Sequence, residues 1–185
     1  MRWNDTGKRI AAAVLLSLTF FLAGCSSQVA DGTALLEEQD YEGAREAFQQ
    51  AVENGENLGE AYRGLGICYW EQEDYENALE AFENALDNGT EATATLYNMM
   101  GLCELNAGTA NRAAYYFENG QKKEGASAEL LQEMAFNEII AYEKAGDYET
   151  ARYRLEDYVE DYPEDTRAAK ELEFLNTQAP ESEAE

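Results

Sequence analysis

The sequence contains no histidine, only 2 prolines and few basic residues. Histidine is the commonest general base and the commonest metal ligand, so its absence argues against most acid–base and metal chemistry. Among the 185 residues, 13 are Lys or Arg and 38 are Asp or Glu, which gives a formal net charge of -25. Because such a chain repels phosphate backbones, we expect no nucleic-acid partner. The scarcity of proline and the 45% of hydrophobic residues argue against a long disordered protein.

The first 24 residues differ in chemistry from the rest of the chain. A start containing Arg2, Lys8 and Arg9 is followed by an uncharged apolar segment over residues 10–22. This segment is shorter than the ~20 apolar residues that a membrane-spanning helix needs, and its length is typical of a signal-peptide core.

The apolar segment ends in Leu-Ala-Gly-Cys, with the cysteine at position 25. This ending resembles the lipobox of bacterial lipoproteins. The resemblance implies that residues 1–24 are removed as a signal peptide and that Cys25 is acylated, with a palmitate-type chain, and becomes the new N-terminus. The alternative is an ordinary buried cysteine at the end of an uncleaved helix.

The chain that begins at Cys25 would carry 10 basic and 37 acidic side chains, a net charge of -27. Anionic headgroups repel such a body. We therefore expect attachment to the membrane through the lipid anchor only, since two or more acyl chains anchor a protein stably.

The remainder of the chain is repetitive. The pattern Ala-x3-Phe-x2-Ala occurs over residues 44–51 and again 34 residues later, over residues 78–85. A third copy, Ala-x3-Phe-x2-Gly, covers residues 113–120, and a fourth begins at Ala151. The dipeptide Asp-Tyr precedes the first, second and fourth copies.

A second pattern, Tyr62-x2-Leu65-Gly66-x2-Tyr69, precedes the second copy. The two patterns together resemble the tetratricopeptide repeat, a 34-residue helix–turn–helix unit. The resemblance implies an all-α solenoid of about four units and a C-terminal capping helix. The expected boundaries are units over about 25–58, 59–92, 94–127 and 128–165, a cap over 166–176, and a disordered acidic tail over 177–185.

The small residues at fixed positions have a steric role. We expect Gly32, Gly66 and Gly101 to allow close approach of paired helices, and Phe48, Phe82 and Phe117 to fill the seam between one pair and the next. Asn54-Gly55 and Asn88-Gly89 are typical of helix ends.

Two repeats depart from the pattern. The third has Glu104 where a tyrosine stands in its neighbours, and the fourth has Ile139 at the glycine position. Four extra residues separate these repeats, which predicts one lengthened helix over 127–145 with Ser127 as its cap.

The sequence predicts no catalytic residue, metal site or cofactor. Cys68 and Cys103 occupy equivalent repeat positions, and we expect two reduced thiols that pack as small apolar side chains. The carboxylate clusters at residues 71–74 and 160–165 match no EF-hand loop, so a solvated surface explains them best.

The resemblance implies that a concave groove, lined by the first helix of each repeat, binds a partner. The candidate groove residues are Arg63, Ile67, Trp70, Asn98, Leu102, Leu105, Phe136, Ile140 and Lys144. The apolar members would supply affinity, and Arg63, Asn98 and Lys144 would contact polar groups of a peptide. The alternative is that several of the apolar members belong to the core.

The leading interpretation is a non-enzymatic, lipid-anchored interaction module on the extracytoplasmic face of a bacterial cell membrane or outer membrane. Its partner would be a protein or peptide that is basic around an apolar segment, and it would support assembly of envelope or surface machinery. A carboxylate-based cell-wall glycan hydrolase on a helical scaffold is the alternative, but the repeats leave no inserted catalytic segment. A solute-binding lipoprotein would need alternating strands and helices, which the sequence does not contain.

Overall fold

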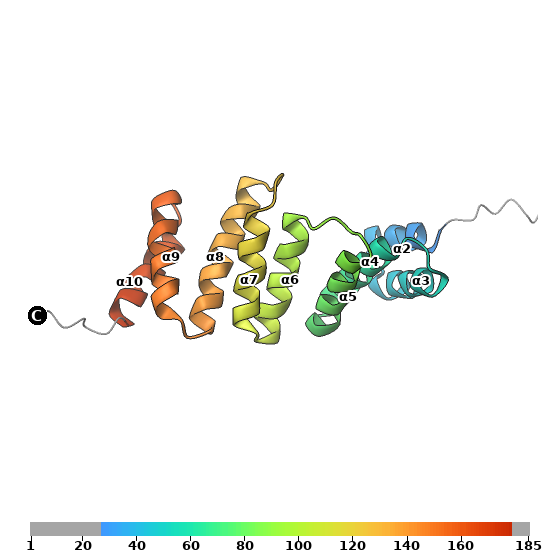
Figure 1. Ribbon diagram of the computed structural model, residues 1–185, viewed down its shortest axis with the longest axis horizontal. Coiled ribbons are helices and arrows are strands. Elements are labelled where there is room, and N and C mark those ends of the chain that lie inside the picture. The colour runs from blue at the N-terminus through green and yellow to red at the C-terminus, as the bar shows by residue number, and fades with distance from the viewer. Residues whose placement is uncertain (1–26, 179–185) are drawn as a thin grey trace, which may run out of the picture.

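The computed structural model describes residues 27–178 of the chain. The predicted signal peptide, Cys25 and residues 179–185 of the predicted tail lie outside these residues. Within them, all regular structure is helical (Figure 1). The helices are α2 Gln28–Glu37, α3 Tyr41–Asn54, α4 Leu58–Glu71, α5 Tyr75–Asp87, α6 Ala94–Ala107, α7 Ala110–Gln121, α8 Ala128–Lys144, α9 Tyr148–Asp161 and α10 Thr166–Gln178. None of these helices is long and apolar enough to cross a membrane.

The helices form successive pairs along the long axis of the molecule. The pairs are α2–α3, α4–α5, α6–α7 and α8–α9, and α10 follows as a single helix (Figure 1). The first helices of neighbouring pairs also touch, α2 against α4 and α6 against α8. The predicted all-α repeat solenoid is confirmed.

The Asp-Tyr dipeptides mark the beginnings of second helices. Asp40, Asp74 and Asp147 precede α3, α5 and α9, and each side chain accepts a hydrogen bond from a backbone N–H three residues further on. Thr109 stands at this position before α7 and makes no such bond. The aspartates recur because the first turn of a helix leaves N–H groups that need an acceptor.

Glycines end helices where the backbone turns into the left-handed region. Gly55, after α3, has a φ of 70°, and Gly89, after α5, has a φ of 91°. The sequence-based prediction for both positions is confirmed, because a side chain at positive φ would be strained.

A phenylalanine ring packs on a glycine within each of the first three pairs. Phe48 lies on Gly32 of its own pair and also on Gly64 of the next pair. Phe82 covers Gly66, and Phe117 covers Gly101, and all three rings are buried. The predicted close approach of paired helices is confirmed, since a Cβ atom at any of these glycines would collide with the ring.

The third repeat replaces an aromatic side chain with an ion pair. Glu104 on α6 is only 1% exposed, and its Oε1 lies 2.8 Å from an Nη atom of Arg112 on α7. Arg112 also pairs with Glu83 on α5 at 2.9 Å, and the hydroxyl of Tyr116 donates to the same Glu83. Burial raises the pKa of Glu104, although Arg112 opposes this effect. The departure from the repeat pattern is therefore compensated across three helices.

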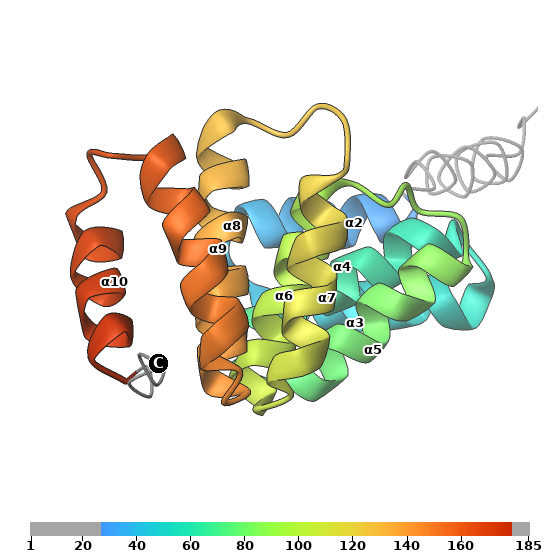
Figure 2. The ribbon, with the colours of Figure 1, turned by 60° about the vertical axis from the view of Figure 1, so that its left-hand side comes forward.

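The fourth repeat contains the predicted lengthened helix. Helix α8 has 17 residues, and Ser127 caps it by accepting a hydrogen bond from the N–H of Leu130. The connection before it rises beyond the neighbouring helix ends (Figure 2). Ile139, at the glycine position, is buried against Leu155 of α9 and Leu175 of α10.

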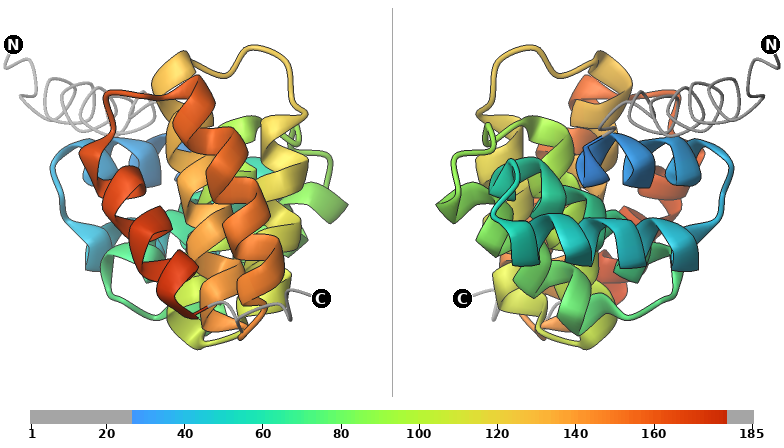
Figure 3. Two further views of the ribbon diagram at one scale, coloured as in Figure 1. Left: turned by 90° about the vertical axis from the view of Figure 1, so that its left-hand side faces the viewer. Right: turned by 90° about the vertical axis from the view of Figure 1, so that its right-hand side faces the viewer.

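Helix α10 covers the C-terminal end of the array (Figure 3). It begins after Asp165, whose carboxylate accepts hydrogen bonds from the N–H groups of Arg167 and Ala168. The hydroxyl of Tyr158 also donates to Asp165, which ties the start of α10 to α9. The helix extends two residues beyond the predicted end of the cap at 176.

Candidate functional site

The predicted groove residues all lie on first helices. Helix α4 carries Arg63, Ile67 and Trp70, α6 carries Asn98, Leu102 and Leu105, and α8 carries Phe136, Ile140 and Lys144. The apolar members are half-buried, Arg63 and Lys144 are exposed, and Asn98 is buried. The nine side chains are thus distributed along the array. Of these nine, Arg63 and Ile67 line one cleft together.

A cleft of about 280 Å³ separates α2 from α4. Arg63 and Ile67 line it from α4, Thr33 and Leu36 line it from α2, and Phe48 contributes to the lining from α3. The cleft offers an apolar floor beside a cation. That cation is already paired, because Arg63 donates to Glu60 one turn earlier.

Trp70 contributes to the packing of the array as well as to its surface. Its ring meets that of Tyr75 edge to face, with 5.3 Å between the centroids. It also packs, with Ile67, against the buried core shared by α4 to α7. Leu102 and Leu105 pack in the same way against the core formed by α6, α7 and α8. These four side chains therefore pack against the core and are also partly exposed.

Asn98 is 6% exposed and lies between two neighbouring first helices. Its Nδ2 donates to Oε1 of Glu133 on α8 at 3.2 Å, and its buried Oδ1 has no hydrogen-bond partner among the described residues. The donor group is thus engaged within the protein, whereas the acceptor is not. The amide of Asn98 therefore links α6 to α8.

Both cysteines of the repeats are buried and free. Burial raises the pKa of Cys68 to about 11 and that of Cys103 to about 12. The thiols are therefore protonated at neutral pH and unreactive. The prediction of reduced thiols that pack as small apolar side chains is confirmed.

Among residues 27–178, no three Cys, Asp or Glu side chains gather in a way that could hold a metal ion.

Comparison with protein families covers most of the described chain. A tetratricopeptide repeat model matches residues 29–93 and 69–128, and a second model of the same repeat matches residues 136–165. The chain belongs to the tetratricopeptide repeat family. Tetratricopeptide repeat proteins are generally non-catalytic scaffolds for protein interaction, and the fold of this chain is of that type. No curated protein sequence matches this chain.

Solved structures of tetratricopeptide repeat proteins share the fold at low identity. YrrB, described as a TPR protein with an unusual peptide-binding site, is 19% identical with a TM-score of 0.71, over 95% of this chain and 84% of that chain. MamA is 17% identical with a TM-score of 0.66, over 80% of this chain and 83% of that one. MamA residues 41-end from Desulfovibrio magneticus RS-1 gives 17% identity and a TM-score of 0.64, over 80% of both chains.

Arg167 is a candidate groove residue that the sequence did not indicate. Its guanidinium lies over the ring of Phe136, 4.6 Å from the centroid, and Asp165 pairs with it at 2.9 Å. Arg167 and Phe136 line a hollow of about 220 Å³ between α8 and α10, together with Glu133. The sequence predicts the C-terminal helix only as a solvating cap of the array. No local sequence pattern links position 167 to position 136.

Proposed function

We propose that this protein is a lipid-anchored interaction module on the extracytoplasmic face of a bacterial membrane. It binds a protein or peptide along the first helices of its repeats and supports the assembly of envelope or surface machinery. The observation that carries the proposal is the series of half-exposed apolar side chains on successive first helices, Ile67 on α4, Leu102 on α6 and Ile140 on α8. The family membership supports a binding role rather than a catalytic one.

The partner is basic around the segment that it presents. The chain has 38 acidic and 13 basic side chains, so complementary charge favours encounter with a cationic partner. Glu133 beside the α8–α10 hollow adds an acidic group at that end of the groove.

The lipid anchor is tested by the substitution Cys25→Ser. The motif that ends at Cys25 predicts that the variant keeps its apolar N-terminal segment and loses its acyl chains. Mass spectrometry of the N-terminus and partitioning into detergent measure both effects. An unchanged mature N-terminus and unchanged partitioning would contradict the lipoprotein assignment.

The groove is tested by the substitution Trp70→Ala. Aromatic side chains dominate binding hot spots, so we expect partner affinity to fall by about 2 kcal/mol or more. The partner is first captured by crosslinking in native membranes, and its affinity is then measured by calorimetry. Circular dichroism checks that the helices survive, which separates loss of a contact from loss of the fold.

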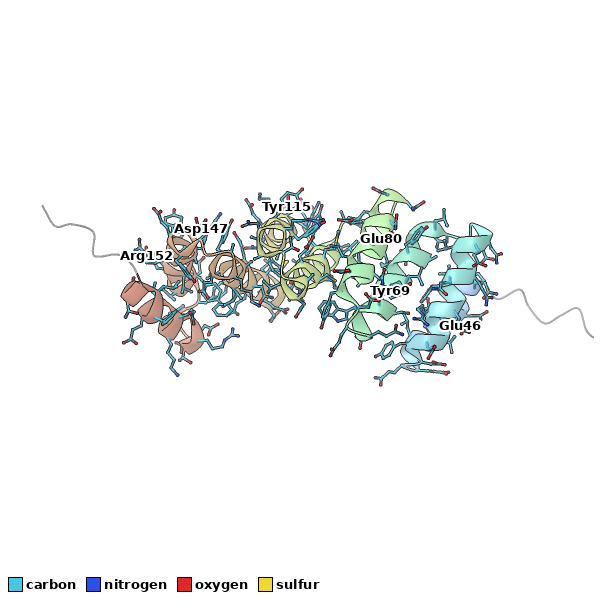
Figure 4. The ribbon with its side chains drawn as sticks, turned by 90° about the horizontal axis from the view of Figure 1, so that it is seen from below. Glu46, Tyr69, Glu80, Tyr115, Asp147 and Arg152 are labelled. Atoms are coloured by element: carbon cyan, nitrogen blue, oxygen red, sulfur yellow. The ribbon has the colours of Figure 1, made fainter. Side chains whose placement is uncertain are left out.

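Tyr115→Ala is the matched control. Tyr115 is 59% exposed on the second helix α7 and projects from the surface of the array (Figure 4). We expect this variant to bind like the parent. Equal losses of partner affinity in both variants, or an unfolded Trp70→Ala protein, would contradict the proposed groove.

A further inference from the structure

A cleft of about 380 Å³ opens between α7, α8 and α9. Leu131, Ala135 and Ile139 of α8 form its apolar wall, and Glu138 of α8 lies among them. Along an α-helix these four positions lie on one side, and the groove residue Ile140 lies on another. Phe136 lies between the two, because its ring packs against Tyr158 of the cleft with 5.5 Å between the centroids. The cleft therefore adjoins the proposed groove at Phe136.

Glu138 is a buried carboxylate with unused capacity to accept hydrogen bonds. It is 5% exposed. Its Oε2 accepts a hydrogen bond from Nε2 of Gln121 at 2.8 Å, and its Oε1 has no hydrogen-bond partner among residues 27–178. Arg154 forms an ion pair with Oε1 at 3.6 Å, a distance longer than that of a hydrogen bond. Burial raises the pKa of Glu138, and Gln121 and Arg154 oppose this effect.

The rest of the cleft adds negative charge and aromatic surface. Asp157 and Asp161 line it from α9, and neither carboxylate has a hydrogen-bond or ion-pair partner within the described chain. With Glu138 they outnumber the one cation of the lining, Arg154. On α7, Glu118 and Lys122 neutralise each other at 2.9 Å and leave this excess unchanged. The half-buried ring of Tyr162 supplies a face that attracts cations.

We propose that this cleft binds a lysine side chain of a protein partner. Lysine combines an apolar stem with a compact ammonium that has three donors. The stem packs along the half-buried Leu131 and Ala135, and the ammonium donates to Oε1 of Glu138 and to the α9 carboxylates. The guanidinium of arginine suits this site less well, because its planar fork needs two free oxygens in one plane.

The lysine site also accounts for the extra turn of the fourth repeat. Leu131 belongs to the first turns of α8, in the stretch that lengthens this helix relative to the other first helices. Ile139 replaces the glycine of the other repeats and completes the apolar wall. The site adds a second contact to partner binding beside the groove.

The test uses the full-length ¹⁵N-labelled chain titrated with N-acetyl-lysine methylamide and followed by NMR. We expect saturable shifts of backbone amides in α8 and α9. N-acetyl-norleucine methylamide, which has the stem without the charge, should cause no such shifts. Shifts of equal size with the norleucine probe, or none with the lysine probe, would overturn the proposal.

Two matched variants localise the effect to the cleft. Asp157→Asn should weaken binding of the lysine probe by about fivefold. Glu160→Gln removes the same charge from an exposed position of α9 outside the cleft and should leave binding unchanged. Equal weakening by the two variants would show that the probe is attracted only by the overall negative charge, and it would overturn the proposed site.

The diamine cadaverine distinguishes the source of the ammonium. Binding of cadaverine no tighter than that of the lysine probe supports a side chain of a partner. Binding about tenfold tighter or more would assign the cleft to a free amine instead. Sedimentation of the unliganded chain as a monomer supports a heterologous partner, and a dimer that Asp157→Asn dissociates would assign the lysine to a second copy.

Discussion

Several single side chains of this array are held in environments that change their acid–base behaviour. Glu143 near the end of α8 is the clearest case, because burial and the nearby Glu171 of α10 raise its pKa to about 7. Its buried Oε1 has no hydrogen-bond partner among the described residues. The two carboxylates are near each other where α10 packs on the last repeat. Their charge state therefore affects the stability of this packing.

The raised pKa predicts a pH-dependent stability. Between the ordinary value of 4.5 and about 7, the folded chain binds the Glu143 proton more tightly than the unfolded chain does. The free energy of unfolding therefore falls as the pH rises through this range. Urea unfolding of Glu143→Gln at pH 4.5 and pH 8 should show a smaller loss of stability than the parent.

Glu149→Gln is the control for this pH effect, because Glu149 is exposed in the first turn of α9. It should keep the pH dependence of the parent. If Glu143→Gln keeps the pH dependence of the parent's free energy of unfolding, a group other than Glu143 binds the proton.

At the scale of the elements, paired helices approach because glycine on one faces phenylalanine on the other. Gly66 lies directly under the ring of Phe82, and both are buried. The same pairing recurs at Gly101 and Phe117. The repeat therefore depends on the absence of a side chain at one position of each of these first helices.

Substitution of that glycine should separate α4 from α5. We expect Gly66→Leu to lower the free energy of unfolding by about 1–3 kcal/mol or more, since overpacking a close-packed core forces its neighbours apart. Glu76→Leu introduces the same side chain on an exposed position of α5 and should change stability by only about 0.5 kcal/mol. Thermal unfolding followed by circular dichroism measures both, and equal effects would contradict the assigned packing.

For the whole molecule, the dominant physical property is the negative charge carried along an extended array. The helix pairs follow one another in a line (Figure 1), and the sequence has a net charge of -25. A long acidic surface attracts a cationic partner before any contact is made. The groove and the lysine cleft both include residues of α8, and they adjoin where Phe136 packs against Tyr158.

This charge predicts how partner binding depends on salt. We expect the association rate constant to fall by about tenfold between low and high ionic strength, with a smaller change in the dissociation rate constant. Surface plasmon resonance with the captured partner at several salt concentrations measures both constants. A rate of association that does not depend on salt would show that charge has no part in the encounter.

The sequence by itself determined the repeat, the helix ends at Gly55 and Gly89, and the lengthened helix that begins after Ser127. Each of these follows from a local pattern: a glycine after a helix, a serine before one, or apolar residues at helical spacing. It also predicted that the groove residues lie on first helices. It left open whether Trp70 packs in the core or faces a partner, because the same periodicity serves both.

Only the tertiary structure decided which side chains meet across helices. The pairing of Glu104 with Arg112, the stacking of Arg167 on Phe136 and the cleft around Glu138 join side chains of different helices. No periodic pattern encodes these contacts, because they depend on how neighbouring helices are spaced and rotated. In the sequence, Glu104 is only a departure from the apolar repeat pattern. The packed array supplies Arg112, the partner that makes burial of this carboxylate stable.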